Sequence, residues 1–376
     1  MIFVDVSAAV HSRAGLGRYS ERLAGALLAQ NPDTYGLFYN QGPDGEFPAG
    51  LPNNAPQRRV GLGYKPWRTA VLAGQKLNSS CQQLLPEATL FHATEHLLIP
   101  LPGIPTVLTV HDLIFKKYPA YHKRLNLWYL NQAMPLFCRR ATALIAVSEA
   151  TKRDVIAEYD IAAEKIHVVH EAAAAHFQPQ EAARIAAVRA AYDLPQRFLI
   201  HLSTIEPRKN LDRLVDAVLR VRTQFPDLQL LLAGSKGWMF EDFFARIERE
   251  DLQGVIRPLG WVPDADLPAV LAAADLAVQP SLYEGFGLPI LEHMASGQVV
   301  AASNCSSFPE VGGEAAAYFD PHDVDEMAAV ITRLLSNKSE YAQRRELGLA
   351  QAQRFSWERA ARETRAVYDE LLEKQA

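Results

Sequence analysis

Two successive series of short apolar runs alternate with helical patterns along this chain, and this alternation constrains the fold more than any other feature. The first series begins at residues 2–6 and ends at 166–169, and after a helical stretch over 181–192 the pattern restarts at 198–202. Short apolar runs between helices are typical of parallel strands that are buried on both faces. With 376 residues, the chain also exceeds the size of one ordinary core. We therefore predict an α/β protein of two Rossmann-like domains whose parallel sheets face a central cleft.

The restart of the pattern sets the predicted domain bounds. The N-terminal domain covers residues 1–180 and the C-terminal domain covers residues 181–355. A last helix, residues 356–376, is expected to cross back to the N-terminal domain. Residues 41–63 are rich in glycine, proline and asparagine, which predicts a loop.

One stretch of the C-terminal half combines glycines, carboxylates and a predicted helix start. Residues 281–287 follow an apolar run and precede helically spaced apolar residues, which predicts a strand, a glycine loop and a helix. A helix N-terminus offers free N–H groups and a partial positive charge, and Gly285 and Gly287 let a ligand approach the backbone closely. Glu284 in the loop and Glu292 one turn into the helix could hold hydroxyl groups. This combination predicts a site for a phosphate-bearing sugar.

Two adjacent cations add to this predicted site. Arg208 and Lys209 follow the strand predicted at 198–202, and the carboxyl ends of parallel strands meet at one edge of a sheet. Arginine can neutralise a diphosphate with a bidentate fork, and lysine can do so as a point charge. The alternative role for the pair is a solvated helix start. Cations near a helix N-terminus oppose the helix dipole, however, so an anion between them is the better explanation.

The N-terminal half opens with a strand, a predicted loop that contains Gly15 and Gly17, and a helix. This order is typical of the start of a Rossmann-like unit. A dinucleotide fingerprint needs a third glycine where this chain has Ser20, so a nicotinamide cofactor is not favoured. The two glycines either form a tight turn or face an anion or an acceptor, together with Arg13 and Arg18.

A histidine follows another predicted strand of the N-terminal half. His111 and Asp112 come directly after the apolar run 106–110. Because open α/β sheets place ligand-binding groups at the carboxyl ends of their strands, these two residues could serve the site. A structural hydrogen-bonded pair is the alternative.

Basic and aromatic residues are mixed in two further segments. A helix predicted over residues 64–85 and the segment 115–124 both combine lysine or arginine with aromatic side chains. Such segments either rest on an anionic membrane surface or form an ordinary amphipathic helix and a solvated loop.

The composition excludes several other classes of protein. The net charge of −5 gives no general attraction to nucleic acid. The 3 cysteines are scattered, which predicts neither a disulfide framework nor a metal site. The opening apolar run, residues 2–6, is shorter than that of a signal peptide, so we expect none there, and no apolar stretch approaches the ~20 residues that span a bilayer. We therefore expect a cytoplasmic protein, with peripheral contact at the inner membrane face left open.

Taken together, these segments resemble the family-4 retaining glycosyltransferases (glycosyltransferase group 1), and mannosyltransferases in particular. The resemblance covers nearly the whole chain, and the glutamate pair within residues 283–292 is its most specific signal. The other matching motifs are Gly15-Leu16-Gly17-Arg18-Tyr19, His111-Asp112-Leu113, Val147-Ser148-Glu149-Ala150-Thr151, Glu206-Pro207-Arg208-Lys209-Asn210, Gly260-Trp261-Val262-Pro263 and Ser306-Ser307-Phe308-Pro309-Glu310-Val311. One departure is His170-Glu171-Ala172-Ala173, which replaces a more usual glycine-containing turn.

The resemblance implies the GT-B fold and a role for each matched residue. The implied catalytic group is His111 near the sugar, Arg208 and Lys209 on the donor diphosphate, and Glu284 on the donor sugar. The implied donor-binding group is Gly15, Gly17, Val262, Gly285, Phe286, Gly287, Leu288 and Glu292, with Glu292 on the ribose and Val262 in a segment that meets the nucleobase. Arg13, Arg18 and Asp112 are expected on the acceptor side.

The implied reaction transfers a hexose, mannose before glucose, from a GDP- or UDP-linked donor to a hydroxyl of a glycan or lipid-linked acceptor. The family retains the configuration at the anomeric carbon. We expect no cofactor and no metal, because Arg208 and Lys209 could supply the charge of a metal ion. We favour a same-face mechanism, because no nucleophilic carboxylate is evident in the N-terminal half. A sugar-nucleotide epimerase of the same fold and a non-catalytic sugar-nucleotide-binding protein are the alternatives.

Overall fold

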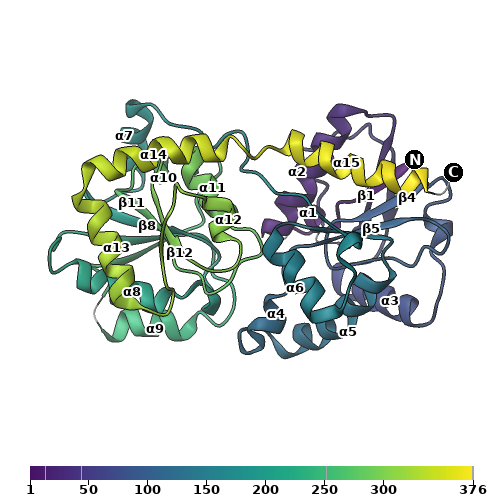
Figure 1. Cartoon of the computed structure of the whole chain (residues 1–376), viewed down its shortest axis with the longest axis horizontal. Coiled ribbons are helices and arrows are strands. Elements are labelled where there is room, and N and C mark those ends of the chain that lie inside the picture. The colour runs from purple at the N-terminus through teal and green to yellow at the C-terminus, as the bar shows by residue number, and fades with distance from the viewer. Residues whose placement is uncertain (13, 44, 251, 375–376) are drawn as a thin grey trace. The chain divides into compact units, whose positions relative to one another are not determined.

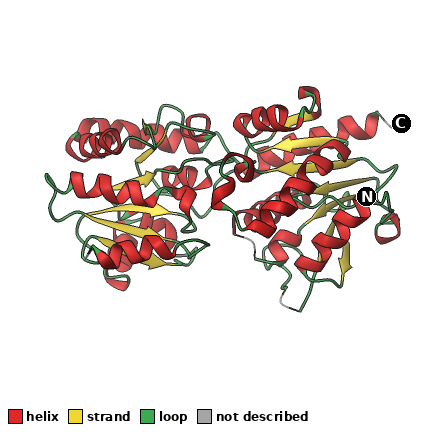
Figure 2. Cartoon of the chain, turned by 90° about the horizontal axis from the view of Figure 1, so that it is seen from below, coloured by secondary structure: helices red, strands yellow, loops and turns green. Residues whose placement is uncertain are grey.

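The computed structural model describes residues 1–12, 14–43, 45–250 and 252–374, and its contacts divide the chain into two compact units (Figure 1). Unit 1 consists of Met1–Glu171 and Ser356–Ala376, and unit 2 consists of Ala172–Phe355. The structural division falls after residue 171, whereas the predicted domains meet after residue 180. In each unit, helices cover both faces of a sheet of parallel strands (Figure 2), as predicted.

Unit 1 contains a seven-stranded sheet in which each strand pairs in parallel with its neighbours. In sheet order the strands are β3 (Gln57–Val60), β2 (Tyr35–Asn40), β1 (Ile2–Asp5), β4 (Leu90–Ala93), β5 (Thr106–Val110), β6 (Ala143–Ala146) and β7 (Ile166–Val168). The strand order reverses at β1, which pairs with both β2 and β4. Such a reversal leaves a crevice at the carboxyl ends of the strands, where open α/β sheets bind ligands.

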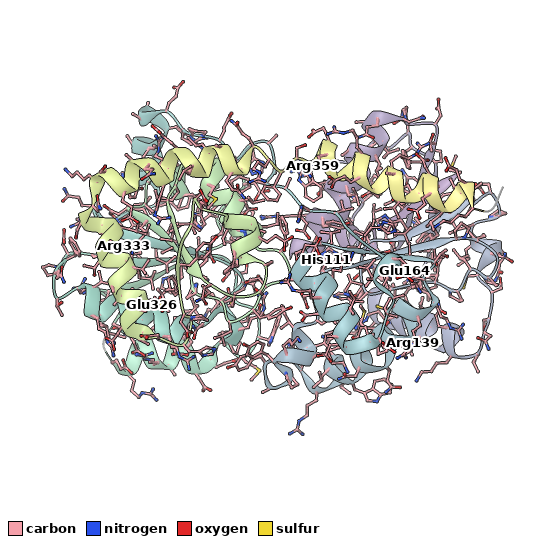
Figure 3. The ribbon with its side chains drawn as sticks, viewed as in Figure 1. His111, Arg139, Glu164, Glu326, Arg333 and Arg359 are labelled. Atoms are coloured by element: carbon pink, nitrogen blue, oxygen red, sulfur yellow. The ribbon has the colours of Figure 1, made fainter. Side chains whose placement is uncertain are left out.

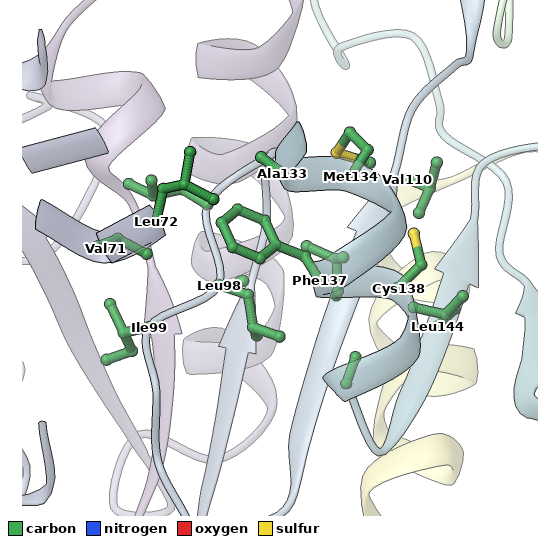
Figure 4. Close-up of a cluster of buried hydrophobic side chains, with 14 of the residues drawn as sticks. Val71, Leu72, Leu98, Ile99, Val110, Ala133, Met134, Phe137, Cys138 and Leu144 are labelled. Atoms are coloured by element: carbon green, nitrogen blue, oxygen red, sulfur yellow. The ribbon is translucent and has the colours of Figure 1, made fainter. Parts of the chain in front are cut away.

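The helices of unit 1 cover both faces of its sheet. They are α1 (Ser7–Val10), α2 (Ala14–Gln30), α3 (Tyr64–Lys76), α4 (Ile114–Lys117), α5 (Arg124–Arg140), α6 (Glu149–Tyr159) and α15 (Trp357–Glu373), with short 3-10 turns η1 (Gln82–Leu84), η2 (Pro119–Tyr121) and η3 (Ala163–Lys165). α2 and α15 pack together on one face, and α3, α5 and α6 lie on the other (Figure 1). Figure 4 shows part of the core on that second face, where Phe137 and Met134 of α5 lie among aliphatic side chains of α3, β5 and β6.

Unit 2 contains a six-stranded sheet that is also parallel throughout. In sheet order its strands are β10 (Ile256–Gly260), β9 (Gln229–Ala233), β8 (Phe198–Leu202), β11 (Leu276–Gln279), β12 (Val300–Ser303) and β13 (Ala317–Phe319). The strand order reverses between β8 and β11, so the loops that follow these two strands flank the switch point.

The helices of unit 2 likewise form two layers. They are α7 (Ala182–Ala191), α8 (Leu211–Val221), α9 (Glu241–Arg249), α10 (Leu267–Ala272), α11 (Leu288–Ala295), α12 (Phe308–Gly312), α13 (Val324–Ser336) and α14 (Lys338–Ala352), with a 3-10 turn η4 (Pro207–Lys209). α8, α9 and α13 supply apolar residues to a core on one face of the sheet. α7, α10, α11 and α14 lie on the other face (Figure 1).

Local sequence explains where several helices begin. The Ser148 hydroxyl accepts a hydrogen bond from the Thr151 N–H at 3.0 Å and so caps the start of α6. Ser356 caps α15 in the same way through the N–H of Arg359. Farther along α15, the Tyr368 hydroxyl lies 2.6 Å from Nδ1 of buried His92 on β4, which fixes the helix on unit 1.

Two predicted segments are wrong. Residues 41–63 are not all loop, because β3 forms an edge strand there. Its residues, Gln57 to Val60, are mostly polar and half-buried, so no apolar periodicity reveals them. The helix predicted over 64–85 ends at Lys76, and Asn78 then adopts a positive φ of 52° that breaks the helix.

Candidate active site

The loops after β8 and β11 meet at the switch point of the unit 2 sheet. Within them, the carboxylate of Glu284 lies between two cations. Its Oε1 is 2.5 Å from Nζ of Lys209, and its Oε2 is 2.7 Å from Nη1 of Arg208. The structure thus brings together three of the four residues that the sequence predicts as catalytic, although Lys209 and Glu284 are 75 residues apart in the chain.

Further contacts hold Arg208 in place. Its Nε donates to Oε1 of Glu206 at 2.6 Å, and its Nη1 donates to the carbonyl of Tyr283 at 3.2 Å. The N–H of Leu282 donates to the Arg208 carbonyl at 2.9 Å. The two loops are therefore joined by both main-chain and side-chain hydrogen bonds, and the guanidinium group is positioned before any ligand binds.

A third loop, between β12 and α12, supports Glu284 from the other side. The Glu284 N–H donates to Oγ of Ser306 at 2.9 Å. The Ser307 hydroxyl donates to the carbonyls of Glu284 and Phe286, at 3.1 and 2.7 Å. These serines fix the backbone on both sides of Gly285.

Burial and charge act in opposite directions on this cluster. Burial alone would raise the pKa of the Glu284 carboxyl group, but the charges of Arg208 and Lys209 outweigh it and lower that pKa to about 2. The pKa of Lys209 is lowered because its ammonium group is buried and, secondly, because Arg208 repels it. Glu284 offsets only part of this effect. An additional anion beside Lys209 would therefore stabilise its charged form.

The start of α11 lies directly after the Glu284 loop. Gly287 has a φ of +102°, and a Cβ there would lie 2.7 Å from a ring carbon of Phe308, so only glycine fits. Pro289 is in the first turn of α11, where a proline costs no helical hydrogen bond, and among the described residues no side chain caps the helix. The first N–H groups of a helix have no partner within it, so those near Leu288 can receive an anion. Glu292 lies one turn further and is buried.

The remaining donor-side residues predicted in unit 2 lie in two segments. Gly285 and Phe286 belong to the Glu284 loop, and the ring of Phe286 packs edge-on against Phe355 at a centroid distance of 5.9 Å. Val262 is buried just after β10, whereas its neighbour Trp261 is 65% exposed. Phe286 is itself buried, so its side chain packs inside unit 2 and is not exposed to a ligand.

In unit 1, His111 is buried at the carboxyl end of β5 (Figure 3). Its Nε2 lies 2.8 Å from the carbonyl oxygen of Thr94, and its Nδ1 lies 3.2 Å from Oε1 of Glu171. The Tyr19 ring packs edge-on against the imidazole at a centroid distance of 4.6 Å. Burial alone would lower the pKa of His111, but Glu171, the Thr94 carbonyl and Asp112 together raise it.

Gly15 and Gly17 do not lie in a loop, and this prediction is wrong. Both are in the first turns of α2. Gly17 is packed closely, because a Cβ there would lie 3.0 Å from the carbonyl oxygen of Ala8, so glycine lets α2 pass close to α1. Among the described atoms, nothing lies within 4 Å of a Cβ added at Gly15. Packing against α1 outweighs the low helix propensity of glycine, which is why the sequence pattern misplaces the helix start.

Of the residues predicted on the acceptor side, the two that the structure describes lie in different segments of unit 1. Arg18 is exposed on α2. The Asp112 carboxylate accepts a hydrogen bond from the N–H of Ile114 at 3.0 Å, at the start of α4. Arg13 lies outside the described residues.

The described carboxylates do not gather as a metal site. In residues 1–12, 14–43, 45–250 and 252–374, no group of three or more His, Cys, Asp or Glu side chains could hold a metal ion. The chain does contain two Asp-x-Asp sequences, but their carboxylates have structural partners. Asp266 accepts from the Tyr192 hydroxyl at 2.6 Å, and Asp323 caps α13.

The two basic and aromatic segments differ in exposure. Trp67 is buried, so α3 packs on its own unit. The second segment, residues 115–124, begins with buried Phe115 and ends with exposed Lys123 and Arg124. Beyond it on α5, Leu125 is 85% exposed and Trp128 is 59% exposed. None of the helices in the described parts of the chain is both long and apolar enough to cross a membrane.

Comparison with known proteins gives consistent matches over most of the chain. The model of Glycosyl transferases group 1 matches residues 187–351, and the model of Glycosyltransferase Family 4 matches residues 13–173. The O-antigen chain mannosyltransferase B of Escherichia coli is 37% identical over 269 residues, which are 70% of this chain and 69% of that protein. The chain belongs to the group 1 glycosyltransferases.

A second related sequence and a solved structure are also similar to this chain. The MMP alpha-(1->4)-mannosyltransferase of Mycolicibacterium hassiacum is 32% identical over 73% of this glycosyltransferase and 67% of its own length. Other curated relatives are longer, and the chain spans about a third of their length. The structure of Anabaena HepE in complex with UDP and glucose matches with a TM-score of 0.75 at 21% identity, over 98% of each chain. The two units of this glycosyltransferase have the GT-B fold.

Two buried carboxylates of this glycosyltransferase had no predicted role. Glu206 is adjacent to the cations in sequence and lies in the same motif, so its spacing could have revealed its bond to Arg208. Glu171 is 60 residues from His111, and only its place after β7, at the same edge of the sheet, hints at the contact.

Proposed function

We propose that this glycosyltransferase moves a hexose, mannose in preference to glucose, from a nucleotide-diphosphate sugar to a hydroxyl of a glycan or lipid-linked acceptor, with retention at the anomeric carbon. The observation that carries the proposal is the Glu284 carboxylate held between two cations beside the start of α11. Arg208 and Lys209 suit a diphosphate, and Glu284 suits the hydroxyl groups of a sugar.

Departure of the diphosphate is the step that this site is suited to assist. Negative charge develops on the leaving oxygen, and groups that are positioned beforehand stabilise it without reorganising. Arg208 is fixed by Glu206 and Tyr283, and Lys209 is buried beside it. Because these cations supply the charge that a metal ion would provide, we propose that the reaction needs no metal.

The role proposed for Glu284 is hydroxyl binding rather than proton abstraction. The cations that hold its pKa at about 2 also make it a weak base at neutral pH. For retention we therefore propose a same-face transfer, in which the bond from the anomeric carbon to the diphosphate breaks while the acceptor oxygen bonds from the same side. The leaving phosphate oxygen accepts the proton of the acceptor hydroxyl.

The choice of donor rests on the relatives. Two of them, at 37% and 32% identity, are named mannosyltransferases, which supports mannose. We propose GDP-mannose as the first donor to test. The fold neighbour HepE was solved with UDP and glucose, so UDP-glucose is the second donor to test.

The acceptor side is proposed in unit 1, which also carries the exposed apolar and basic end of α5. Leu125 and Trp128 could enter the interface of an anionic membrane while Lys123 and Arg124 contact lipid head groups. A peripheral membrane contact of this kind suits a lipid-linked acceptor, so we propose the contact together with that acceptor.

Turnover of labelled donors tests the proposal. GDP-mannose and UDP-glucose are each incubated with short mannosides, and proton NMR records the anomeric configuration of any new linkage. We expect a new α-mannosidic linkage from GDP-α-mannose. A β-linkage would contradict retention, and an altered sugar nucleotide formed without acceptor would instead support an epimerase.

A further inference from the structure

The two ring nitrogens of His111 face a carbonyl oxygen and a carboxyl group. The Thr94 carbonyl oxygen, 2.8 Å from Nε2, has no proton to donate. The Glu171 carboxylate, 3.2 Å from Nδ1, is an acceptor when ionised. With Glu171 ionised, both nitrogens carry a proton to make these bonds, and a ring with two N–H groups is an imidazolium cation.

A second buried histidine of the same unit shows the contrast. His92 faces two hydroxyl groups, Tyr368 at 2.6 Å and Thr109 at 2.8 Å, and a hydroxyl can donate as well as accept. A neutral ring satisfies both of these contacts. Burial, followed by the charge of His111, lowers the pKa of His92 to about 3. Burial alone thus leaves a histidine of this unit neutral, and a carboxylate partner is what distinguishes His111.

Glu171 is well placed to fix the charge of that ring. It is buried, with 5% exposure, and it lies just after β7 at the end of the first segment of unit 1. The His111 ring is also held on another side by Tyr19, whose edge-on packing restricts rotation. Glu171 belongs to the segment that replaces the glycine-containing turn expected from the family resemblance.

We propose that Glu171 is a positioning residue that keeps His111 protonated, with both N–H groups committed inside unit 1, so that His111 acts as a fixed cation and not as a proton donor or acceptor. The charge state itself does not depend on the proposed transfer, whereas its use in the reaction rests on that function. A cation that is fixed in this way can stabilise negative charge without reorganising.

The other titratable groups around the ring lie on several elements. They are Asp112 next in the chain, His92 on β4, His96 after β4 and Tyr19 on α2. Of these, Asp112 favours the charged ring, as Glu171 does, while His92 stays neutral. The pKa of His111 is raised by these partners in spite of burial, which agrees with the hydrogen-bond geometry.

Ring NMR of the ligand-free full chain tests the charge state. Histidine is labelled with ¹⁵N, the His111 signals are assigned with H111N, and the ring is followed from pH 5 to 9. We expect the wild-type imidazolium to persist above pH 6.5, and a titration at lower pH in E171Q, which keeps the shape but loses the charge. E171D, which keeps the charge, should stay close to the wild type. The exposed Glu164 of the same unit (labelled in Figure 3) provides the matched control E164Q, which should not move the titration.

Steady-state kinetics with a donor that the protein turns over tests whether the positive charge of His111 contributes to the reaction. E171Q should lower kcat at pH 8 by roughly tenfold or more, and by much less at pH 6, with little change in the KM for the donor. A loss that is equal at both pH values would mean a merely structural role and would overturn the proposal, as would a wild-type His111 that is neutral at pH 7. If no donor is turned over but the ring titrates as expected, the proposed transfer fails while the role of Glu171 in protonation stands.

Discussion

The cations Arg208 and Lys209, which we propose bind the donor diphosphate, are in contact with the carboxylate of Glu284. The Glu284 carboxylate lies between both cations. A diphosphate would share the same cations, and Glu284 would then be free to bind sugar hydroxyls. The cluster is therefore preorganised for a donor at the scale of single residues.

Replacing Glu284 by glutamine separates binding from turnover. E284Q should lower kcat by about 10²–10³-fold, because a fixed polar contact to the sugar is changed. It should bind GDP at least as tightly as the wild type does, because the anion that competes for the cations is gone. Isothermal titration and initial rates measure the two effects, with the exposed Glu248 of α9 as control in E248Q. Loss of GDP binding in E284Q would contradict this account.

The lowered pKa of Glu284 also predicts a pH dependence of stability. A carboxyl group whose pKa is lower in the folded state stabilises that state above its unfolded pKa, near 4.5, and this stabilisation is lost as the pH falls toward about 2. Between pH 6 and pH 3, the free energy of unfolding measured with urea should therefore fall more steeply in the wild type than in E284Q. If the free energy of unfolding fell equally with pH in the two proteins, the lowered pKa of Glu284 would be contradicted.

At the scale of elements, Gly287 determines the backbone conformation between the Glu284 loop and α11. G287A would put a Cβ against Phe308 and require a residue other than glycine at a φ of +102°. Each of these effects costs about 1–3 kcal/mol, so Tm and donor affinity should both fall. The control is G254A, where a Cβ meets nothing within 4 Å in the described structure. An unchanged Tm in G287A would show that the loop can adjust.

The exposed end of α5 predicts membrane binding by an element rather than by a single residue. L125S/W128S should weaken sedimentation with phosphatidylglycerol vesicles by at least tenfold, because two apolar side chains leave the interface. L347S, a partly exposed leucine of α14, is the matched control. Equal binding of the wild type to neutral and anionic vesicles would argue against a role for Lys123 and Arg124.

Sequence patterns predicted the elements that are apolar and regular, and missed those that are not. β8 was predicted with its observed bounds because its residues are mostly apolar and buried in a parallel sheet. β3 was missed because an edge strand of polar residues has no apolar period. The start of α2 was misplaced because close packing on α1 explains Gly17, and this is a tertiary effect that no local pattern contains.

At the scale of the whole molecule, topology explains which site residues could be predicted. Glu284 and the cations follow strands that end at one edge of a sheet, so the rule for parallel strands is enough to place them together. The bond from Glu171 to His111 depends on side-chain orientation across 60 residues, which the rule does not fix. Each unit thus has a predictable edge, whereas the pairing of side chains along that edge depends on how they are oriented.

The central claim is that Arg208 and Lys209 bind the diphosphate of a sugar nucleotide without a metal ion. Isothermal titration of GDP-mannose and UDP-glucose into the full chain in EDTA tests it most directly. The account predicts that one of these donors binds in EDTA and that R208Q and K209M each weaken this binding about 100-fold or more, while E248Q does not. Binding that appears only with added Mn²⁺, or that survives both substitutions, would contradict it.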